Sequence, residues 1–365
     1  MRASVPSTAL VPRRFMDSSP SLRRATSRSE PATVQDVARL AGVSPATVSR
    51  ILTGSARVAE DKRRAVEAAI QKLKFRPNLS ARGLRSGSTH TIGVLTQELE
   101  SPYFANAVKG VDEGLTGSGY TPIVVPGHWN PDEESERVAL LTARKVDALI
   151  VLGGRLSEGR LAELAQQLPV AIIGRRTEAA GVFSFYQDQV EGARLATEHL
   201  IGLGHRRIAH IAGPSSQVDG QERKEGFMLA HRQAGLSVDP ALIVEGDFME
   251  SGGIAAMEAL LSAGHEFSAV FCANDQSLWG AKLVLHRRGL RVPEDFSLVG
   301  FDDLPQSKYM TPPVTAVRQH TFAMGQAAAW ALLHALGRES VEPAPIVPAI
   351  QLEVRETTGR WHRSA

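Results

Sequence analysis

The chain contains one cysteine, Cys272, among its 365 residues. A single cysteine cannot form a disulfide within the chain, so nothing in the sequence requires an oxidising compartment. Its neighbours in AVFCAND are mostly apolar, which favours a small buried residue over a reactive thiol. Apolar runs of 18 or more residues are also absent, and the pair Arg13-Arg14 is not followed by the apolar segment of an export signal. The sequence therefore predicts a cytoplasmic protein with no membrane partner.

Motifs for catalysis, metal binding and cofactor binding are missing as well. His199, His205 and His210 stand at i, i+6 and i+11, which places no two on one helical face, and no cysteine pair accompanies them. No glycine-rich stretch matches a phosphate-binding loop, and no G-x-S-x-G nucleophile motif occurs. The sequence predicts a protein that is not an enzyme and that holds no metal and no cofactor.

Charge is divided unevenly along the chain. Residues 1–88 hold 17 Lys and Arg against 6 Asp and Glu, about +11, whereas residues 89–365 hold 24 against 33, about −9. The two charges give the net +2 of the whole chain. A strongly basic first part suits a polyanion such as DNA, and the acidic remainder does not.

Residues 1–32 are rich in Ser, Pro, Ala and Arg and have no apolar period, which predicts a disordered basic tail. Translation starting at Met16 is an alternative explanation of this segment. Helical periodicity begins at Thr33, where Asp36 three residues later forms a capping-box pattern. Gly42 can end this helix in the left-handed conformation, and Ser44-Pro45 can begin another.

Two further helices are predicted, Pro45 to Leu52 and Glu60 to Leu73. Three short helices, a tight glycine turn and a basic surface are typical of a helix-turn-helix unit, whose second helix enters the major groove of DNA. A generic three-helix bundle is the alternative. The stretch T-V-Q-D-V-A-R-L-A-G-V-S-P-A-T-V-S-R-I-L-T-G decides between them, because it resembles the DNA-binding headpiece of the lactose/galactose repressor (LacI/GalR) family.

The resemblance assigns DNA-binding roles to six headpiece residues. It implies that three of them face base edges and that Arg50 bonds a guanine. The other three would contact phosphates and fix the register. Two positions depart from the family pattern: Thr53 replaces an Asn, and Ala59 replaces a Ser that caps the third helix, which weakens that cap by about 1 kcal/mol. The base-facing residues are Pro45, Ala46 and Arg50, and the phosphate-contacting residues are Ser44, Thr47 and Ser49.

In this family, the segment after the headpiece is a hinge that becomes helical on operator DNA and wedges a leucine into the minor groove. The resemblance maps this hinge onto residues 77–88, with Asn78, Ala81 and Leu84 as its DNA-binding residues. A plain flexible linker is the alternative. Gly83 costs up to about 1 kcal/mol in a helix interior, so this hinge should melt more easily than most.

Beyond residue 88 short apolar runs alternate with helical patterns. Such alternation predicts parallel sheets covered by helices, with binding sites at the carboxyl ends of the strands. The region resembles the effector domain of the same family, which is related to periplasmic sugar-binding proteins. The predicted fold class is therefore an all-α headpiece followed by an α/β domain of two parallel-sheet subdomains. Strands are expected at 90–96, 120–127, 146–154, 169–176, 206–214, 242–248, 267–275 and 296–303.

The resemblance also sets the expected domain organisation. After the tail (1–32) come the headpiece (33–76), the hinge (77–88), an effector-binding and dimerisation domain (89–360) and a short end (361–365). The chain is expected to cross between the two effector subdomains near residues 189, 319 and 344, which would permit hinge closure. The end GRWHRSA carries no leucine heptad, so a homodimer is expected rather than a tetramer.

Seven residues are predicted to bind the effector. The resemblance makes Arg223 a guanidinium that forks onto ligand oxygens and Asp302 a carboxylate that accepts hydroxyl hydrogen bonds. For Phe248 ring packing competes with a core role, and for Asn274 polar recognition competes with loop capping. The first subdomain is predicted to contribute three residues. Tyr103 and Phe104 lie in one loop, and Asp188 lies in a loop that follows a strand.

The predicted function is a DNA-binding transcriptional regulator, a repressor released from a palindromic operator by a small sugar or sugar derivative. A regulator that responds to a nucleobase or a phosphorylated metabolite as corepressor is the alternative. A solute-binding receptor without a DNA role is a distant third possibility.

Overall fold

The computed structural model describes residues 32–53, 58–75, 88–338 and 344–361. The chain divides into two units, Met1–Leu79 and Ser80–Ala365. The predicted hinge residues Asn78, Ala81 and Leu84 lie outside the described residues. Within the described parts, no helix is both long enough and apolar enough to cross a membrane.

The described residues of the first unit form three helices, as predicted. Thr33 caps the first of them through a capping box with Asp36, and Gly42 ends it at φ 66°, in the left-handed region. Ser44 Oγ accepts a hydrogen bond from Thr47 N at 3.2 Å, which begins the second helix. No side chain caps the third helix, because Ala59 stands at its N-cap. The helices are α1 (Val34–Ala41), α2 (Pro45–Thr53) and α3 (Glu60–Leu73).

A small apolar core holds these helices together. It consists of buried residues from all three helices and of Phe75, which follows α3 and is 7% exposed. The lysines and arginines of α3 remain on its outer face. The headpiece is thus a compact helical unit with a basic surface. The buried residues are Val37, Ala38, Val48, Val66, Ala69 and Phe75.

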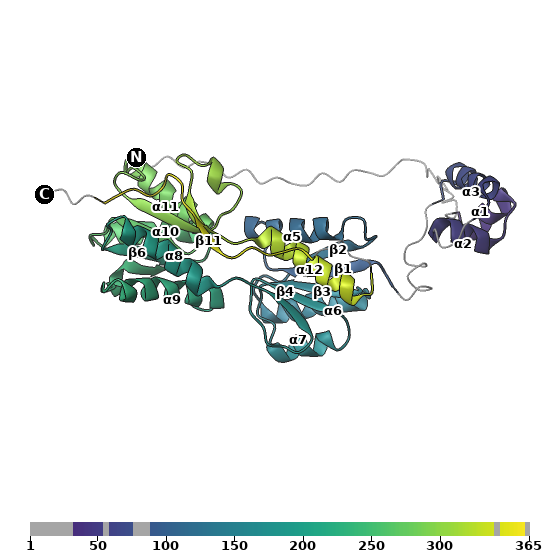
Figure 1. The fold of residues 1–365 in the computed structure, drawn as a ribbon, viewed down its shortest axis with the longest axis horizontal. Coiled ribbons are helices and arrows are strands. Elements are labelled where there is room, and N and C mark those ends of the chain that lie inside the picture. The colour runs from purple at the N-terminus through teal and green to yellow at the C-terminus, as the bar shows by residue number, and fades with distance from the viewer. Residues whose placement is uncertain (1–31, 54–57, 76–87, 339–343, 362–365) are drawn as a thin grey trace, which may run out of the picture. The chain divides into compact units, whose positions relative to one another are not determined.

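The second unit is built on two sheets (Figure 1). The first sheet has the order β2-β1-β3-β4-β5, and all its pairs are parallel. The inner strands β1, β3 and β4 are almost entirely buried, because helices cover both faces. The strands are β1 (Thr91–Thr96), β2 (Thr121–Pro126), β3 (Ala148–Leu152), β4 (Val170–Ile173) and β5 (Val182–Phe185).

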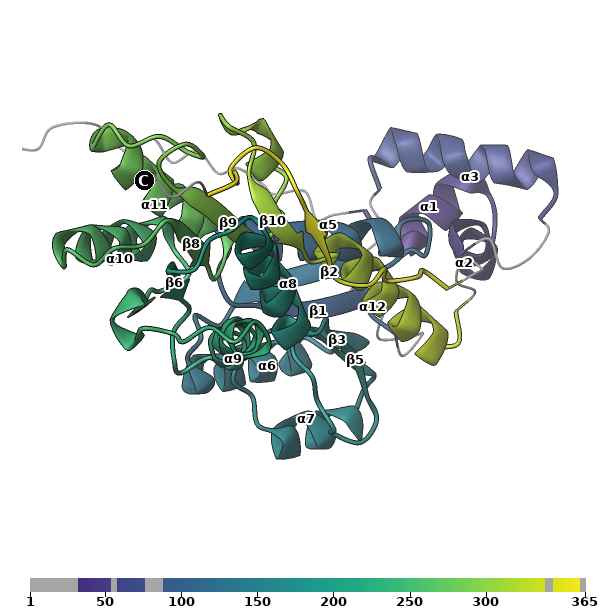
Figure 2. The ribbon, with the colours of Figure 1, turned by 60° about the vertical axis from the view of Figure 1, so that its left-hand side comes forward.

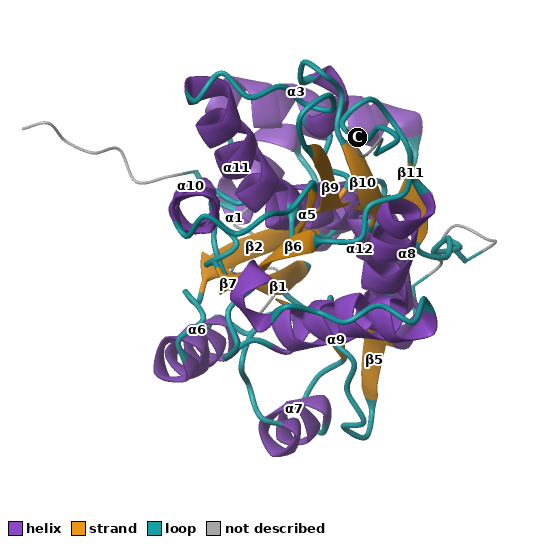
Figure 3. Cartoon of the chain, turned by 90° about the vertical axis from the view of Figure 1, so that its left-hand side faces the viewer, coloured by secondary structure: helices purple, strands orange, loops and turns teal. Residues whose placement is uncertain are grey.

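The second sheet has the order β11-β10-β9-β8-β6-β7 and is parallel except for β11, which runs antiparallel to β10. Helices α10 and α11 lie on one side of this sheet and α8 on the other (Figure 3). The strands are β6 (Ile208–Ala212), β7 (Ile243–Glu245), β8 (Ala269–Cys272), β9 (Ser297–Asp302), β10 (Thr315–Arg318) and β11 (Gln351–Glu353).

The helices follow the strands in the order expected for this fold class. Four of them cover the first sheet: α5 (Pro102–Leu115), α6 (Pro131–Ala143), α7 (Glu158–Ala165) and α12 (Thr321–Ala335). Another four cover the second sheet: α8 (Gln189–Gly202), α9 (Val218–Gln233), α10 (Glu250–Ser262) and α11 (Asp275–Arg287). Short 3-10 helices, η1 (Pro240–Leu242) and η2 (Ser307–Tyr309), complete the set of described helices.

All eight predicted strands are present, but three others were not predicted. These are β5, β10 and β11, which have only four, four and three residues. None of them forms a continuous apolar run, and β5 and β11 lie at sheet edges where their side chains are partly exposed. The prediction of eight strands was therefore wrong, because short strands lack the apolar run that marks a buried one.

The chain crosses between the two sheets three times. It leaves the first sheet after β5 and enters α8 at Gln189, and it returns after β10 through Gln319 to α12. Helix α12 then lies against α5 although more than two hundred residues separate them (Figures 1 and 2). The last crossing lies between Val347, which packs against the core of the first sheet, and Ile350, which packs against the core of the second sheet. This position is a few residues beyond the one expected, near Ala344.

Candidate functional site

A cavity lies where the carboxyl ends of both sheets face each other. Its lining residues follow β1 to β4 of the first sheet and β6 to β9 of the second, as expected for parallel α/β sheets. The empty space is about 570 Å³, counting the part that opens to solvent. The lining residues are Glu98, Ser101, Tyr103, Phe104, Trp129, Gly153, Gly174, Gln217, Asp219, Arg223, Asp247, Phe248, Met249, Asn274, Gln276 and Asp302.

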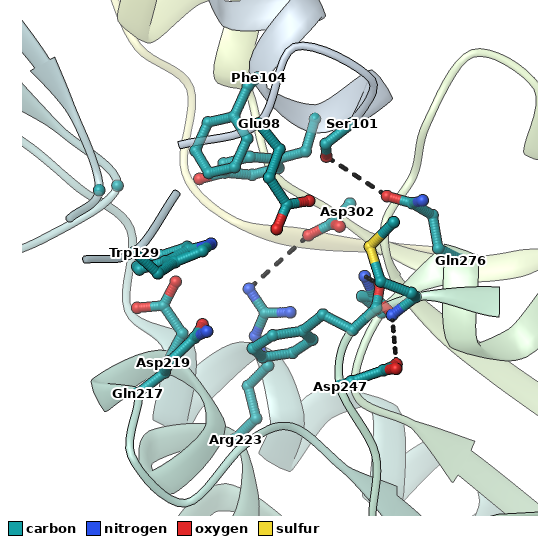
Figure 4. Close-up of a pocket in the computed structure, with 16 residues that line it drawn as sticks. Glu98, Ser101, Phe104, Trp129, Gln217, Asp219, Arg223, Asp247, Gln276 and Asp302 are labelled. Atoms are coloured by element: carbon teal, nitrogen blue, oxygen red, sulfur yellow. Dashed lines mark hydrogen bonds and ion pairs between the residues drawn. The ribbon is translucent and has the colours of Figure 1, made fainter. Parts of the chain in front are cut away.

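Arg223, on the second turn of α9, is the cation of this cavity and is 3% exposed. Its guanidinium points toward Asp302 (Figure 4), with 3.7 Å between Nη2 and Oδ1. The same group lies 4.0 Å from the ring centre of Phe301 and 5.3 Å from that of Phe248. Because these contacts fix the guanidinium plane, Arg223 can present its donors to a ligand in one orientation.

Asp302 is the last residue of β9 and has a φ of 101°. Non-glycine residues seldom adopt this conformation, and those that do are concentrated at functional sites. Burial raises the pKa of the Asp302 carboxyl to about 6, although Arg223 and the hydrogen bond from Gln319 favour the charged form. The carboxyl of Asp302 is therefore expected to titrate near pH 6, above the usual range of an aspartate.

Aromatic rings form much of the cavity wall. Tyr103 and Phe104 meet edge to face at 5.1 Å, and Trp129 lies 6.1 Å from Phe104. Trp129 and Phe248 both have positive φ angles, 55° and 66°. Apolar ring faces beside a few fixed polar groups are typical of a small-molecule site.

Carboxylates outnumber cations among the lining residues. Glu98, Asp219, Asp247 and Asp302 face one guanidinium, that of Arg223. Burial raises the pKa of Glu98 and of Asp219 above their usual values. Burial also raises the pKa of the Tyr103 phenol, and nearby Asp219 and Asp302 add to that shift, so the hydroxyl stays protonated. The cavity thus offers many acceptors for hydroxyl groups and few partners for an anion.

A chain of glutamine side chains links this site to the crossings between subdomains. Arg223 Nε donates to Gln189 Oε1 at 3.0 Å, and Gln189 Nε2 donates to Gln319 Oε1 at 2.8 Å. Gln319 Nε2 then donates to Asp302 Oδ1 at 2.8 Å, which closes a ring that returns to the ion pair. Gln187 adds a second tie between crossings, because it accepts from His320 N at 2.9 Å and donates to Pro348 O at 2.6 Å.

The structure brings together six of the seven residues predicted to bind the effector. Asn274 lines the cavity, but its Oδ1 caps α11 at Ser277 N and its Nδ2 donates to Phe248 O, so it shapes the loop as the alternative expected. Asp188 lies apart from the cavity lining. It is exposed and caps α8 by accepting from Glu191 N at 2.9 Å.

Several lining residues were missed by sequence reasoning, although a signal was present. Trp129 follows a predicted strand by two residues, and Glu98 and Asp219 also follow strand ends closely. The rule that sites lie at the carboxyl ends of parallel strands would have found them. Gln276, two residues after Asn274, accepts a hydrogen bond from Ser101 Oγ at 3.3 Å and so connects the two subdomains.

On the headpiece, the predicted DNA-binding residues lie together at the start and along one side of α2. Pro45, Ala46 and Arg50 are exposed. Thr47 and Ser49 are half-buried. The hydroxyl oxygens of Ser44 and Thr47 lie 2.9 Å apart and are hydrogen-bonded. A helix that follows a tight turn and exposes one polar face has the geometry of a recognition helix.

Comparison with known families identifies the family of the chain. Residues 33–78 match the family of bacterial regulatory proteins of the lacI type. Residues 89–351 match the family described as periplasmic binding proteins and sugar binding domain of the LacI family. The chain belongs to the LacI family. It is a DNA-binding transcriptional regulator, and regulators of this family bind operator DNA and small-molecule effectors.

Individual relatives agree with this assignment. The chain is 37% identical over 299 residues to the transcriptional regulator GalR of Escherichia coli, covering 82% of this chain and 87% of GalR. It is 35% identical over 319 residues to the transcriptional repressor PurR of Yersinia enterocolitica, covering 86% and 93% of the two chains. The predictions of family and of a regulator rather than an enzyme are confirmed.

Solved structures confirm the predicted fold class. The Lac repressor dimer bound to operator and the anti-inducer ONPF superimposes with a TM-score of 0.79 at 28% identity, covering 90% of this chain and all of that one. The complex of the transcriptional regulator CelR with cellobiose gives a TM-score of 0.65 at 34% identity, covering 89% and 99%. The LacI-family regulator described here thus has the two-part architecture of its relatives.

Proposed function

We propose that this regulator is a repressor that leaves its operator when a neutral, hydroxylated ligand, a sugar or sugar derivative, enters the cavity between the effector subdomains. The excess of carboxylates over cations in the cavity carries the proposal. Sugar hydroxyls donate to carboxylates such as Glu98 and Asp302, and the apolar faces of sugar rings pack on aromatic side chains such as Trp129.

The charge balance speaks against a phosphorylated ligand. A phosphate brings about two negative charges at neutral pH into a cavity that already holds four carboxylates and one guanidinium. Like charges in a buried site repel strongly because the local dielectric is low. A neutral nucleobase would avoid this repulsion, but it offers fewer hydroxyl donors to the carboxylates than a sugar does.

On the DNA side, we propose that two copies of the chain form a homodimer that binds a palindromic operator. The exposed side of α2 supports this, since Pro45, Ala46 and Arg50 stand where a recognition helix faces base edges. Ser44, Thr47 and Ser49 would contact phosphates. Residues 77–88, with Asn78, Ala81 and Leu84, stay the proposed hinge in the minor groove on the family resemblance alone.

The decisive experiment selects operator DNA from a random pool and then titrates ligands into the complex. Neutral monosaccharides and disaccharides, nucleobases and sugar phosphates are each added while fluorescence anisotropy reports DNA release. We expect a neutral sugar to release the operator. Release by a sugar phosphate alone, or operator binding strengthened by a nucleobase, would replace the proposal with the corresponding alternative.

The assignment of the site has its own test in the same assay. Arg223→Ala should keep operator binding but abolish the response to the sugar, because the oriented guanidinium is lost. Arg232→Ala, on the exposed side of the same helix, is the matched control and should respond as the wild type does. An unchanged response in Arg223→Ala would show that the ligand binds elsewhere.

A further inference from the structure

A second cavity continues from the first toward the start of α9. The two share five lining residues, so they adjoin each other. The second space is about 500 Å³, again counting the part open to solvent. In Figure 4 Trp129, Gln217 and Asp219 lie together at the side where the second cavity begins, away from Asp247 and Gln276. The shared residues are Trp129, Gly153, Gly174, Gln217 and Asp219.

Two of the shared residues, Gly153 and Gly174, are glycines with positive φ angles. Gly174 has a φ of 84°, and a Cβ there would lie 2.9 Å from Tyr103 Oη. At Gly153, with a φ of 63°, a Cβ would come within 3.2 Å of the Trp129 ring. Both glycines therefore let Tyr103 Oη and the Trp129 ring lie directly against the loops that follow β3 and β4.

The polar groups of the second compartment suit a neutral unit better than an anion. Arg175 donates from Nη1 to Gly154 O at 2.9 Å and from Nη2 to Leu156 O at 2.8 Å, so its fork already holds a loop. Arg155 donates to Ser216 Oγ at 2.9 Å and is exposed. Asp219 adds a carboxylate at the entrance. The compartment thus mixes donors with acceptors, and both of its guanidinium groups already have hydrogen-bond partners within the protein.

We infer that the cleft takes a ligand of two linked sugar rings. The first ring lies between Arg223, Asp302 and Phe248, and the second lies beyond Trp129 in the adjoining cavity. Arg155, Gln217 and Asp219 bind hydroxyl groups of the second ring. This inference rests on the proposed function, because it assumes that the first compartment binds a sugar.

The test measures ligand affinities by isothermal titration calorimetry on the full-length chain. The probes are glucose, galactose, the disaccharides cellobiose, maltose and lactose, and glucose 6-phosphate. We expect one disaccharide to bind at least about tenfold more tightly than either of its component monosaccharides. Val218→Trp places a bulky ring in the second compartment, where Val218 is 52% exposed, and should remove that advantage.

A second variant guards against misfolding as an explanation. Arg155→Ala should lower the disaccharide affinity about three- to tenfold through one lost charged donor. Arg160→Ala, a half-buried arginine outside the cleft, should leave that affinity unchanged. Equal affinities for monosaccharides and disaccharides, unaffected by Val218→Trp, would overturn the two-ring inference and leave the proposed function standing. A preference for glucose 6-phosphate that depends on Arg155 would overturn it in favour of an anion compartment. Failure of every neutral sugar to bind while operator binding persists would instead overturn the proposed function.

Discussion

Asp302 is the single residue whose chemistry is most directly testable. Its pKa of about 6 lies above the usual 3.8, so the folded chain holds a proton there that the unfolded chain has lost between about pH 4 and 6. This contribution to stability is present at low pH and is lost as the pH rises through 6. Sugar hydroxyls that donate to the carboxylate stabilise its charged form, so ligand binding should release a proton near pH 6.

We therefore expect ligand affinity to rise between pH 5 and 7 and then level off. Calorimetry in buffers of different ionisation enthalpy measures the released proton directly. Asp302→Asn should abolish both the pH dependence and the proton release, whereas Glu294→Gln, an exposed carboxylate of the same subdomain, should preserve them. Proton uptake instead of release would mean that the ligand binds the protonated carboxyl.

Arg50 is the residue whose replacement is expected to lower operator affinity most specifically. Removing a bidentate contact to guanine costs about 1–3 kcal/mol, so Arg50→Ala should weaken operator binding about five- to 150-fold. Affinity for random DNA should change little. Arg64→Ala, an exposed arginine of α3, should lower both affinities slightly and equally, because it acts only through charge. Equal losses on operator and random DNA in Arg50→Ala would remove its base-reading role.

At the scale of elements, the third headpiece helix lacks a side-chain cap at its N-terminus. Ala59 offers no side-chain oxygen to the first N–H groups of α3. Ala59→Ser should stabilise the headpiece by about 1 kcal/mol, which hydrogen exchange of the α3 amides would measure. Ala68→Ser, on the exposed face in the middle of α3, should give no gain. If the two variants behave alike, the cap is not limiting.

The elements also show how far sequence reasoning reaches. Helix boundaries in the headpiece were predictable because Thr33, Gly42 and Ser44 mark them with local chemistry. Buried strands such as β3 and β8 were predictable from their apolar runs. Strands β5, β10 and β11 were not, because pairing with a neighbouring strand, and not their own sequence, makes them strands.

Some site residues could also be predicted from the sequence, whereas others depend on the folded structure. Arg223, Phe248 and Asp302 could be predicted because the family pattern marks them. Trp129 is marked in the sequence only by its place two residues after a predicted strand, and the folded loop after β2 shows that it lines the cavity. Asp188 shows the reverse case, since a polar residue at a strand exit serves as the N-cap of α8.

On the scale of the whole molecule, the crossings connect the ligand site to the rest of the chain. Gln187, which is 6% exposed, joins His320 of the second crossing to Pro348 of the third. Gln187→Leu should leave sugar affinity within about threefold and reduce the effect of the sugar on operator binding, because a few kcal/mol of coupling passes between the sites. Gln187→Glu keeps the acceptor for His320 N and should retain more of that effect. Full coupling in Gln187→Leu would show that the crossings act without this tie.

In the proposed mechanism, a sugar bound in the cleft changes the affinity of the headpieces for the operator. Coupling between two binding equilibria is reciprocal, so each ligand must change the affinity of the other by the same factor. The most direct measurement determines operator affinity with and without saturating sugar, and sugar affinity with and without operator, in one buffer. The account predicts that both affinities fall by the same factor, about five- to 150-fold. Sugar affinity that is identical on free and operator-bound protein would contradict it.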